Sequence, residues 1–387
     1  MKQKYNNQQE KLVLTDQETL TQVVDCLNEN ISLNDHGKKK NNDLFLVLVR
    51  AASTQNTIEN SSKELKLATC GNNIRFHLKK ISDFLKLEKE INTALKNQIP
   101  CGLKNNCLTV AVDFNLIGYY GEPNQEEKPY ICRSQAKNGT CSFYGYATIY
   151  TIKKNKRVTL GIRAIRVKET KVCILTHLLS ELSSLNIKIE KLYLDREFFS
   201  ISIIRWLQGL EIPFIIPAIR RGKEAGIKQF MKGRKSYRTN YKMLKNKEDY
   251  VDCSLAIIVK YKKGKRGKKG REYYVYVTNK IKINIEQIHS CYRKRFGIES
   301  SYRMKNICRI RTTTKKPVWR LLFVGISFLL VNIWVKILWK KVSKPRKGGR
   351  LVYDKIFSLK QMLSFLNHAI ERIFQVETNV YIPTISS

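Results

Sequence analysis

The sequence predicts an α/β fold preceded by a small helical domain. Apolar residues recur at helical spacing through the first hundred residues, and from residue 107 the apolar period changes to two. Strand-like and helix-like segments then alternate. A chain of 387 residues can bury more than one core. We expect a helical domain over 1–104, an α/β domain over 105–345 with a basic β-rich insertion at about 217–285, and a helical tail over 346–387.

The first 104 residues contain a series of candidate helices, the last two being "TQNTIENSSKELKL" and "NNIRFHLKKISDFLKL". A turn containing Gly71 separates these two, which is the cadence of a helix-turn-helix. The second helix would then present polar side chains to DNA, namely Asn72, Asn73, Arg75, His77 and Lys79. Any small helical bundle with a polar face has the same pattern, so both interpretations stay open.

Residues 105–219 supply the strands and helices of the predicted sheet. The strand candidates "CLTVAVDFNLIGYYG", "YGYATIYTIKK" and "RVTLGIRAIRV" come first. They are followed by helix, strand, helix and strand: "VCILTHLLSELSSL", "IEKLYLD", "FSISIIRWLQGL" and "IPFIIPAI". Three meandering strands followed by alternating units of this kind match a ribonuclease H-like fold, a mixed sheet flanked by helices.

Positive charge is the strongest feature of the composition. The 72 Lys and Arg residues outnumber the 32 Asp and Glu residues, so the formal net charge is +40. No fold needs such an excess, but a polyanionic partner would exploit it. Basic residues occur in every third of the chain, which favours a track of nucleic-acid phosphates over a membrane surface or acidic proteins.

The segment "KKGKRGKKGR", residues 262–271, concentrates this charge between two candidate strands. A loop of this composition cannot form a core. The loop is either a solvated hairpin tip or a segment that contacts DNA phosphates, which would relieve the repulsion between its lysines and arginines. We favour the second interpretation. The candidate DNA-binding residues here are Lys262, Lys263, Lys265, Arg266, Lys268, Lys269 and Arg271.

Cysteine spacing and hydropathy argue against zinc and against a membrane. No two of the ten cysteines have the C-x2-C spacing of a zinc site, and the N-terminus has no apolar core typical of a secretory signal. Reduced cytosolic thiols are the simplest interpretation. The apolar segment 321–338 reaches the lower length limit for a membrane span, but it contains Asn332 and Lys336. We therefore predict a buried core helix there, with a membrane protein as the rival hypothesis.

Two aspartates stand on predicted strands of the α/β domain. Asp195 ends the strand of "KIEKLYLDREFFS", and Asp113 lies within "TVAVDFN". Asp195 is either the cap of the following helix or a metal ligand at the edge of the sheet. In a ribonuclease H-like sheet the two strands are neighbours, so two ionised carboxylates would stand together and require a cation. Mg²⁺ suits such a pair, because it prefers oxygen ligands and needs only one or two protein carboxylates.

A third acid is expected from the segment "CYRKRFGIESSYRMKN". At 100° per residue, Tyr292, Arg295 and Glu299 lie within about 60° of one another on one helical face. The guanidinium would bind phosphate oxygens, the ring would stack on a base, and the carboxylate would complete the metal site. The alternative is an exposed face with an ordinary Arg–Glu pair.

The stretches "AVDFN", "LYLDREFF" and "YRKRFGIESSYRMK" together resemble the three acidic motifs of DD-E insertion-sequence transposases, in the group allied to the insertion-sequence-four family. The resemblance covers roughly residues 105–340 and includes the Y-x2-R-x3-E spacing of that group's signature. It implies that Asp113, Asp195 and Glu299 are catalytic and hold Mg²⁺, with Mn²⁺ as a substitute.

The resemblance also implies a reaction and its partners. The reaction would be two-metal cleavage of double-stranded DNA at transposon terminal repeats and transfer of the 3′-hydroxyl into target DNA. The expected state is a homodimer on DNA, in the cytoplasm and associated with the nucleoid. A domesticated, inactive transposase that only binds DNA is the alternative.

The chain departs from the family signature after the third acid. The family's lysine position is occupied by Asn306, and Lys305 is one residue early. On a regular helix Arg303 lies about 40° from Glu299 and Lys305 about 120° away, so we expect Arg303 to be the better phosphate contact. Glu197, where the family usually has glycine, adds an acid beside the site.

Overall fold

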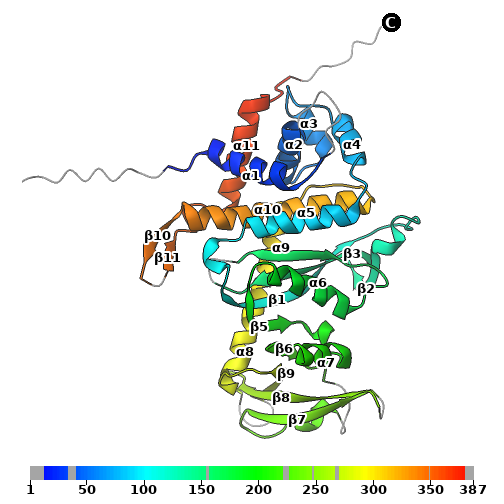
Figure 1. Cartoon of the computed structure of the whole chain (residues 1–387), viewed down its shortest axis with the longest axis vertical. Helices are drawn as coiled ribbons and strands as arrows, with labels where there is room; N and C mark the ends of the chain where they lie inside the picture. Colours follow the sequence, from blue (N-terminus) through cyan, green and yellow to red (C-terminus); the bar gives the residue numbers. More distant parts are fainter. Residues whose placement is uncertain are drawn as a thin grey trace, which may run out of the picture.

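The computed structural model of the chain describes residues 13–33, 41–153, 157–220, 226–245, 248–265, 270–347 and 349–379 (Figure 1). The helices are α1 (Asp16–Asn30), α2 (Asn41–Ser53), α3 (Ile58–Lys63), α4 (Gly71–Lys79), α5 (Phe84–Asn97), α6 (Lys171–Ser183), α7 (Ile201–Gly209), α8 (Ile285–Arg293), α9 (Gly297–Ile307), α10 (Pro317–Lys340) and α11 (Leu359–Phe374). The strands are β1 (Cys107–Gly118), β2 (Ile131–Lys137), β3 (Thr140–Thr151), β4 (Thr159–Ala164), β5 (Lys188–Leu194), β6 (Phe214–Pro217), β7 (Tyr237–Leu244), β8 (Tyr250–Tyr261), β9 (Arg271–Asn279), β10 (Ser343–Arg346) and β11 (Gly349–Val352).

One mixed sheet of nine strands organises the described part of the molecule. Its order is β2-β3-β1-β5-β6-β9-β8-β7, with β4 pairing on β3. β1 is antiparallel to β3 and parallel to β5, which in turn is parallel to β6. The predicted α/β class is therefore confirmed. The β-rich insertion is not a separate unit, because β9 pairs with β6 and carries β8 and β7 onto the same sheet.

The two faces of the sheet are covered by different helices. Val110 and Val112 of β1 join the apolar core that includes α6 and α7. Ala111 of β1 and Tyr193 of β5 belong to the core on the opposite face, together with Tyr292 of α8. Successive strand residues point to opposite faces, so the residues two positions after Ala111 and Tyr193 also point toward α8 and α9.

The outer edge of β4 is closed by side chains of helices. The Asn332 amide in α10 donates to the Thr159 carbonyl at 2.8 Å and accepts from the Thr159 N–H at 3.0 Å. Asn92 of α5 makes the same pair of bonds with Ile162, at 3.0 and 2.8 Å. Each amide supplies one donor and one acceptor, as a neighbouring strand would, so the edge has no free backbone groups at these two positions.

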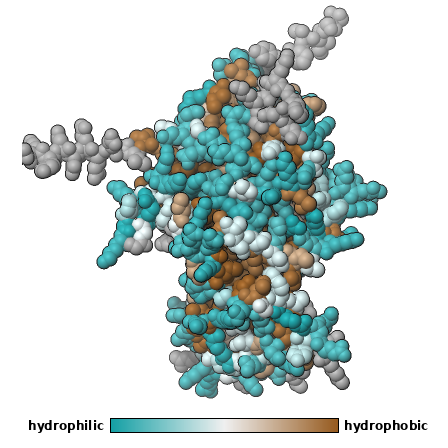
Figure 2. Space-filling model, in the orientation of Figure 1, coloured by the Kyte–Doolittle hydropathy of each residue, from teal (hydrophilic) through white to brown (hydrophobic). Residues whose placement is uncertain are grey.

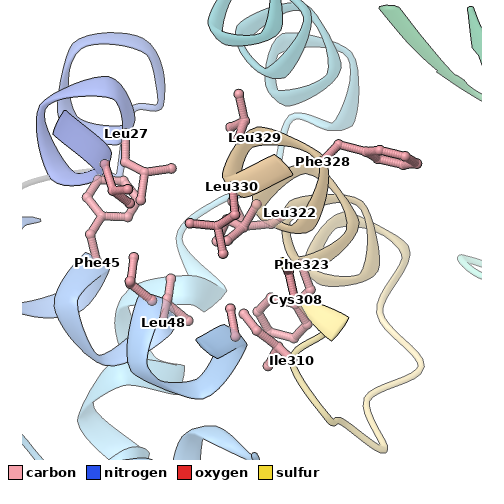
Figure 3. Packing of buried hydrophobic residues seen from close by; sticks show 14 of the residues in the cluster. Leu27, Phe45, Leu48, Cys308, Ile310, Leu322, Phe323, Phe328, Leu329 and Leu330 are labelled. Atoms are coloured by element: carbon pink, nitrogen blue, oxygen red, sulfur yellow. The ribbon is translucent and has the colours of Figure 1, made fainter. Parts of the chain in front are cut away.

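α5 and α10 form a layer beyond this edge, and α1, α2, α3, α4 and α11 form a cluster above that layer (Figure 1). α1, α2, α5, α10 and α11 share one apolar core with the loop after α9, and Figure 3 shows part of it. The residues expected to form a helical tail, 346–387, contain β11, which pairs with β10 just before them, and α11. α11 is held on the N-terminal helices by Glu371, which binds Arg50 at 2.5 Å, and by Arg372, which binds Asp16 at 2.5 Å.

α10 is the predicted apolar helix. Within the described residues it is the one helix whose length and composition would allow a membrane span, and 89% of its most apolar window is buried inside the protein. The prediction of a core helix therefore agrees with the structure. Figure 2 shows that the surface seen in this view is mainly hydrophilic.

The amide clamp on β4 leads to a stability prediction. Asn332→Leu removes both bonds to Thr159 and leaves a buried N–H and a buried carbonyl without partners, which costs about 1–3 kcal/mol for each group. We expect the free energy of unfolding to fall by about 2–5 kcal/mol in urea titrations. Asn306→Leu, at an exposed position of α9, is the control. Equal stability of the two variants would mean that the clamp contributes nothing.

Candidate active site

Asp113 and Asp195 lie side by side at the meeting point of two parallel strands. In the β1–β5 register Val112 pairs with Leu194, so the next residue on each strand is one of the two aspartates. Both carboxylates point to the sheet face covered by α8 and α9. The expected neighbourhood of the two acids, 82 positions apart in the sequence, is thus a consequence of the strand order.

The alternative role of Asp195 as a helix cap is excluded by its contacts. Asp195 precedes a short 3₁₀ turn, Arg196–Phe198, and its side chain makes no capping hydrogen bond. The cap of the following helix, α7, is Ser200, whose hydroxyl accepts from the Ile203 N–H. The carboxylate of Asp195 is therefore available to the site.

Arg295 occupies the space between the two acids. One terminal nitrogen of its guanidinium lies 3.4 Å from Asp113 Oδ2, and the other lies 3.4 Å from Asp195 Oδ1. These distances exceed the roughly 2.7–2.9 Å of tight charged hydrogen bonds, as expected for one cation shared by two anions. The Arg295 side chain is only 7% exposed, and among the described residues its Nε has no hydrogen-bond partner. The guanidinium faces the acids, not a phosphate-binding surface.

Burial dominates the protonation of Asp113. Desolvation raises the pKa of this carboxyl to about 6, although Arg295 opposes the shift. Asp195 and Glu197 add smaller repulsive contributions that also raise the pKa. Near neutral pH the carboxyl is therefore largely ionised, in surroundings that favour a nearby cation.

Three tyrosines hold the helices against the site. Tyr292 of α8 donates to the Leu194 carbonyl at 3.1 Å, directly before Asp195. Tyr302 of α9 donates to the Asp113 backbone carbonyl at 3.0 Å. Tyr150 of β3 donates to the Gly297 carbonyl at 3.0 Å, where α9 begins. Sequence reasoning missed Tyr302 and Tyr150, because their roles depend on contacts between distant segments.

Tyr292 differs from its predicted role. The ring is only 5% exposed and packs against Tyr193 and Tyr276, with ring centroids 5.9 and 5.1 Å apart. It cannot stack on a base in this arrangement; it fixes the end of β5 instead. The exposed aromatic ring here is Phe296, which is 46% exposed and has the Arg295 guanidinium 5.5 Å from its centroid.

Glu299 is not brought into contact with the two aspartates. Lys294–Phe296 form a 3₁₀ turn between α8 and α9, so the uniform 100° per residue assumed for this segment does not hold. Tyr292 and Arg295 are buried, whereas Glu299 is exposed in the first turn of α9. Among the described residues no three His, Cys, Asp or Glu side chains form a group that could hold a metal ion.

Arg303 and Lys305 have opposite environments. Arg303 is exposed, while Lys305 is 2% exposed, with its ammonium 5.8 Å from the centre of the Phe328 ring. Lys305 therefore faces the α10 core and is not available to DNA in this arrangement. The expectation that Arg303 and Lys305 lie on different faces agrees with the structure.

The basic segment lies at the tip of the β8–β9 hairpin. Lys262 pairs with Glu272 at 3.0 Å, and Arg271 donates to the Gly233 carbonyl at 2.8 Å. Lys263 and Lys265 are exposed. Arg266, Lys268 and Lys269 lie outside the described residues. Of the predicted phosphate-binding residues, Lys262 and Arg271 already have partners within the protein, whereas Lys263 and Lys265 are exposed to solvent.

The candidate helix-turn-helix corresponds to α3 and α4, but the second predicted helix, 72–87, is interrupted, because α4 ends at Lys79 and α5 begins at Phe84. Arg75 binds Glu59 at 2.8 Å, and His77 is 6% exposed. Asn72 and Lys79 are exposed and Asn73 is half-buried. Of the polar side chains expected to read DNA, His77 is not accessible.

Comparisons with known proteins identify the family of this chain. The family described as "Transposase DDE domain" matches residues 108–332, more than half of the chain. The chain belongs to this family of DDE transposases. The matched range includes Asp113 of β1, Asp195 directly after β5, and Glu299 of α9.

One solved structure has a fold similar to that of this chain. It is described as the "Cryo-EM structure of piggyBac transposase synaptic complex with hairpin DNA (SNHP)". The TM-score is 0.53 at 15% sequence identity, and the match covers 94% of this chain and 80% of the other. No curated protein matches the chain.

The two aspartates fit a divalent cation. Their oxygens converge on one buried cationic group, Arg295, so the site already holds positive charge between them. Two carboxylates are sufficient protein ligands for Mg²⁺, which retains several waters. In this arrangement Glu299 is not part of that ligand set.

Lys305 provides a pH-dependent prediction. Burial lowers the pKa of this lysine to about 8, and neighbouring Arg309 lowers it further while Cys308 opposes the shift. The unfolded chain binds the proton more tightly, so the buried charge costs stability below pH 8, and the cost disappears as pH rises toward 10.5. Lys305→Met should stabilise the fold by about 3 kcal/mol at pH 7, and the gain should vanish by about pH 10.5 in urea titrations.

The control for this pH dependence is Lys282→Met, at an exposed position, which should give no pH-dependent gain. A constant difference between Lys305→Met and wild type across this pH range would contradict a depressed lysine pKa.

Proposed function

We propose that this protein is an active DNA transposase that cleaves transposon ends and transfers the 3′-hydroxyl into target DNA. The observation that carries the proposal is the pair of carboxylates at the ends of neighbouring parallel strands, inside the matched transposase domain. The net charge of +40 supports a DNA partner. The similar piggyBac structure is itself a complex with hairpin DNA.

The catalytic core is proposed to be ribonuclease H-like. The order of the sheet supports this assignment. Its strands run β4-β3-β1-β5-β6; β4, β3 and β1 pair antiparallel, whereas β1, β5 and β6 pair parallel. The Y-x2-R-x3-E spacing at Tyr292, Arg295 and Glu299 supports the group allied to the insertion-sequence-four family.

Asp113 and Asp195 are proposed to hold Mg²⁺ or Mn²⁺, and Glu299 is proposed as the third acid. A divalent ion bound there would supply Lewis acidity for the attacking and leaving oxygens of phosphoryl transfer. Arg303 and Phe296 are exposed beside the site and would contact a phosphate and a base. For Glu299 to act with the aspartates, the first turn of α9 must rotate, and the 3₁₀ turn before it is the natural hinge.

Cleavage of DNA by charge-neutral variants tests the proposal. Asp113→Asn, Asp195→Asn and Glu299→Gln should each abolish Mg²⁺-dependent cleavage of a plasmid that carries the DNA flanking the coding sequence, because each removes a metal ligand. Binding of the same DNA in EDTA should change little, since distributed phosphate contacts provide the affinity. Agarose gels and gel-shift titrations measure the two properties.

Glu197→Gln is the matched control for these variants, because Glu197 is an exposed acid beside the site that pairs with Lys171 at 3.9 Å. It should retain cleavage. Wild-type cleavage by Glu299→Gln would remove Glu299 from the triad. A wild-type protein that binds DNA but never cuts it would support the domesticated, inactive alternative.

The position of Arg295 predicts competition with metal ions. Arg295→Met removes the cation between the two aspartates, so we expect Mn²⁺ to bind about tenfold more tightly, the equivalent of about 1.4 kcal/mol. Electron paramagnetic resonance of free Mn²⁺ measures the affinity without reference to activity. Lys294→Met removes the same charge from the adjacent, exposed position and should leave the affinity unchanged. Unaltered Mn²⁺ affinity in a folded Arg295→Met protein would show that the guanidinium does not compete.

A further inference from the structure

A groove lies between the helical part of the molecule and the loop that follows α9. Its volume is about 860 Å³. Its walls come from the α3–α4 region, the end of α9 and the segment 309–314, and its lining includes Arg75, Asn306, Arg309, Arg311, Thr312 and Thr313. The groove is distinct from the aspartate pair, and it combines elements separated by more than 200 positions.

Firm contacts hold the two walls together. The Arg311 backbone N–H donates to the Asn56 carbonyl at 3.0 Å, and the Trp319 indole donates to the Leu78 carbonyl at 2.9 Å. Cys308 and Ile310 pack beside Phe323 on the core beneath the loop (Figure 3). The backbone of the loop is therefore anchored, while the Arg309 and Arg311 side chains are exposed.

The charge of the groove is unbalanced. Its acid, Glu59, is already paired with Arg75 at 2.8 Å and with Lys63 at 3.3 Å. Gly71 allows this approach, because a Cβ there would lie 2.3 Å from Glu59 Oε2. Within the described ranges no ion pair involves Arg309 or Arg311. Two uncompensated arginines beside threonine hydroxyls suit the phosphates of an anionic polymer.

The exposed side of α9 leads from Glu299, the proposed third acid, into the groove. Glu299, Arg303 and Asn306 are exposed at i, i+4 and i+7, and Asn306 lines the groove. At 1.5 Å per residue, Glu299 and Asn306 are about 10 Å apart along the helix, which equals about three nucleotides of one strand in a duplex. The aromatic residues of the groove, Trp319 and Phe323, are only 7% and 4% exposed, so they offer no stacking platform for unpaired bases.

We propose that this groove binds the sugar-phosphate backbone of duplex DNA beyond the cleaved bond, with Arg309 and Arg311 as the phosphate contacts. This inference rests on the proposed function and extends it to a second contact region. The groove would join the helical part and the catalytic part on one stretch of DNA, so that binding and cleavage keep a fixed spacing.

Salt-dependent binding of the double variant Arg309→Gln/Arg311→Gln tests the groove. The probes are a fluorescent duplex and a single strand of the same length, titrated in EDTA by anisotropy. We expect duplex affinity to fall about tenfold, and the slope of log affinity against log salt to decrease by about 0.9 for each lost phosphate contact. The matched control is Lys344→Gln/Arg346→Gln, at exposed positions of the hairpin after the far end of α10.

The outcomes separate this inference from the proposed function. If wild type binds the duplex and both double variants lose affinity equally, the groove has no specific role and the inference fails, while the proposed function stands. A loss confined to the single-stranded probe would overturn the assignment to duplex DNA. If wild type fails to bind any DNA, the proposed function fails together with the groove. Circular dichroism melting of both double variants establishes that they are folded.

Discussion

Two carboxylates forced together by strand register set the central constraint on this structure. Asp113 and Asp195 follow the paired residues Val112 and Leu194, so they cannot separate without breaking the β1–β5 ladder. Like charges at this range repel by several kcal/mol when partly buried. Arg295 relieves the repulsion, and because the Asp195 side chain is 36% exposed, losing one partner costs less than the roughly 3–5 kcal/mol typical of a fully buried ion pair. The surroundings of the site must therefore keep one guanidinium in place.

The elements around the site serve this requirement. Tyr292 ties α8 to the last carbonyl of β5, and Tyr302 ties α9 to the Asp113 carbonyl, so the 3₁₀ turn that carries Arg295 is fixed at both ends. α9 in turn packs on α10, whose Asn332 closes the edge of β4. The chain of contacts thus runs from the acids through α9 and α10 to the opposite edge of the sheet. In this way the long apolar helix and the polar active site belong to one packed unit.

The sequence was sufficient where local periodicity determines the outcome. The change to period two at residue 107, together with the helix and strand alternation after it, predicts β1, β3, β4, β5 and β6 in chain order, and the adjacency of Asp113 and Asp195 was expected from the likeness of that order to a ribonuclease H-like sheet. It was insufficient where an irregular turn intervenes. The faces assigned to Tyr292, Arg295 and Glu299 assumed one regular helix, but a 3₁₀ turn interrupts it at 294–296, and Glu299 is exposed whereas Tyr292 and Arg295 are buried. Long-range contacts such as that of Tyr302 with Asp113 have no local sequence signal. The packing of α11 on the N-terminal helices could not be predicted for the same reason.

The distribution of charge matters more for binding than its total. Arg295 neutralises acids inside the protein, Lys262 pairs with Glu272, and Arg271 donates to a backbone carbonyl, so these residues must exchange an existing partner before they contact a phosphate. Arg309 and Arg311 are exposed on an anchored loop, and in the part of the chain that the structure describes neither has an ion-pair partner to lose. A phosphate contact gains more where no internal ion pair has to be broken first, because the cation then has no existing partner to give up. For this reason the short segment after α9 is better suited to define the path of DNA than the much more basic hairpin between β8 and β9.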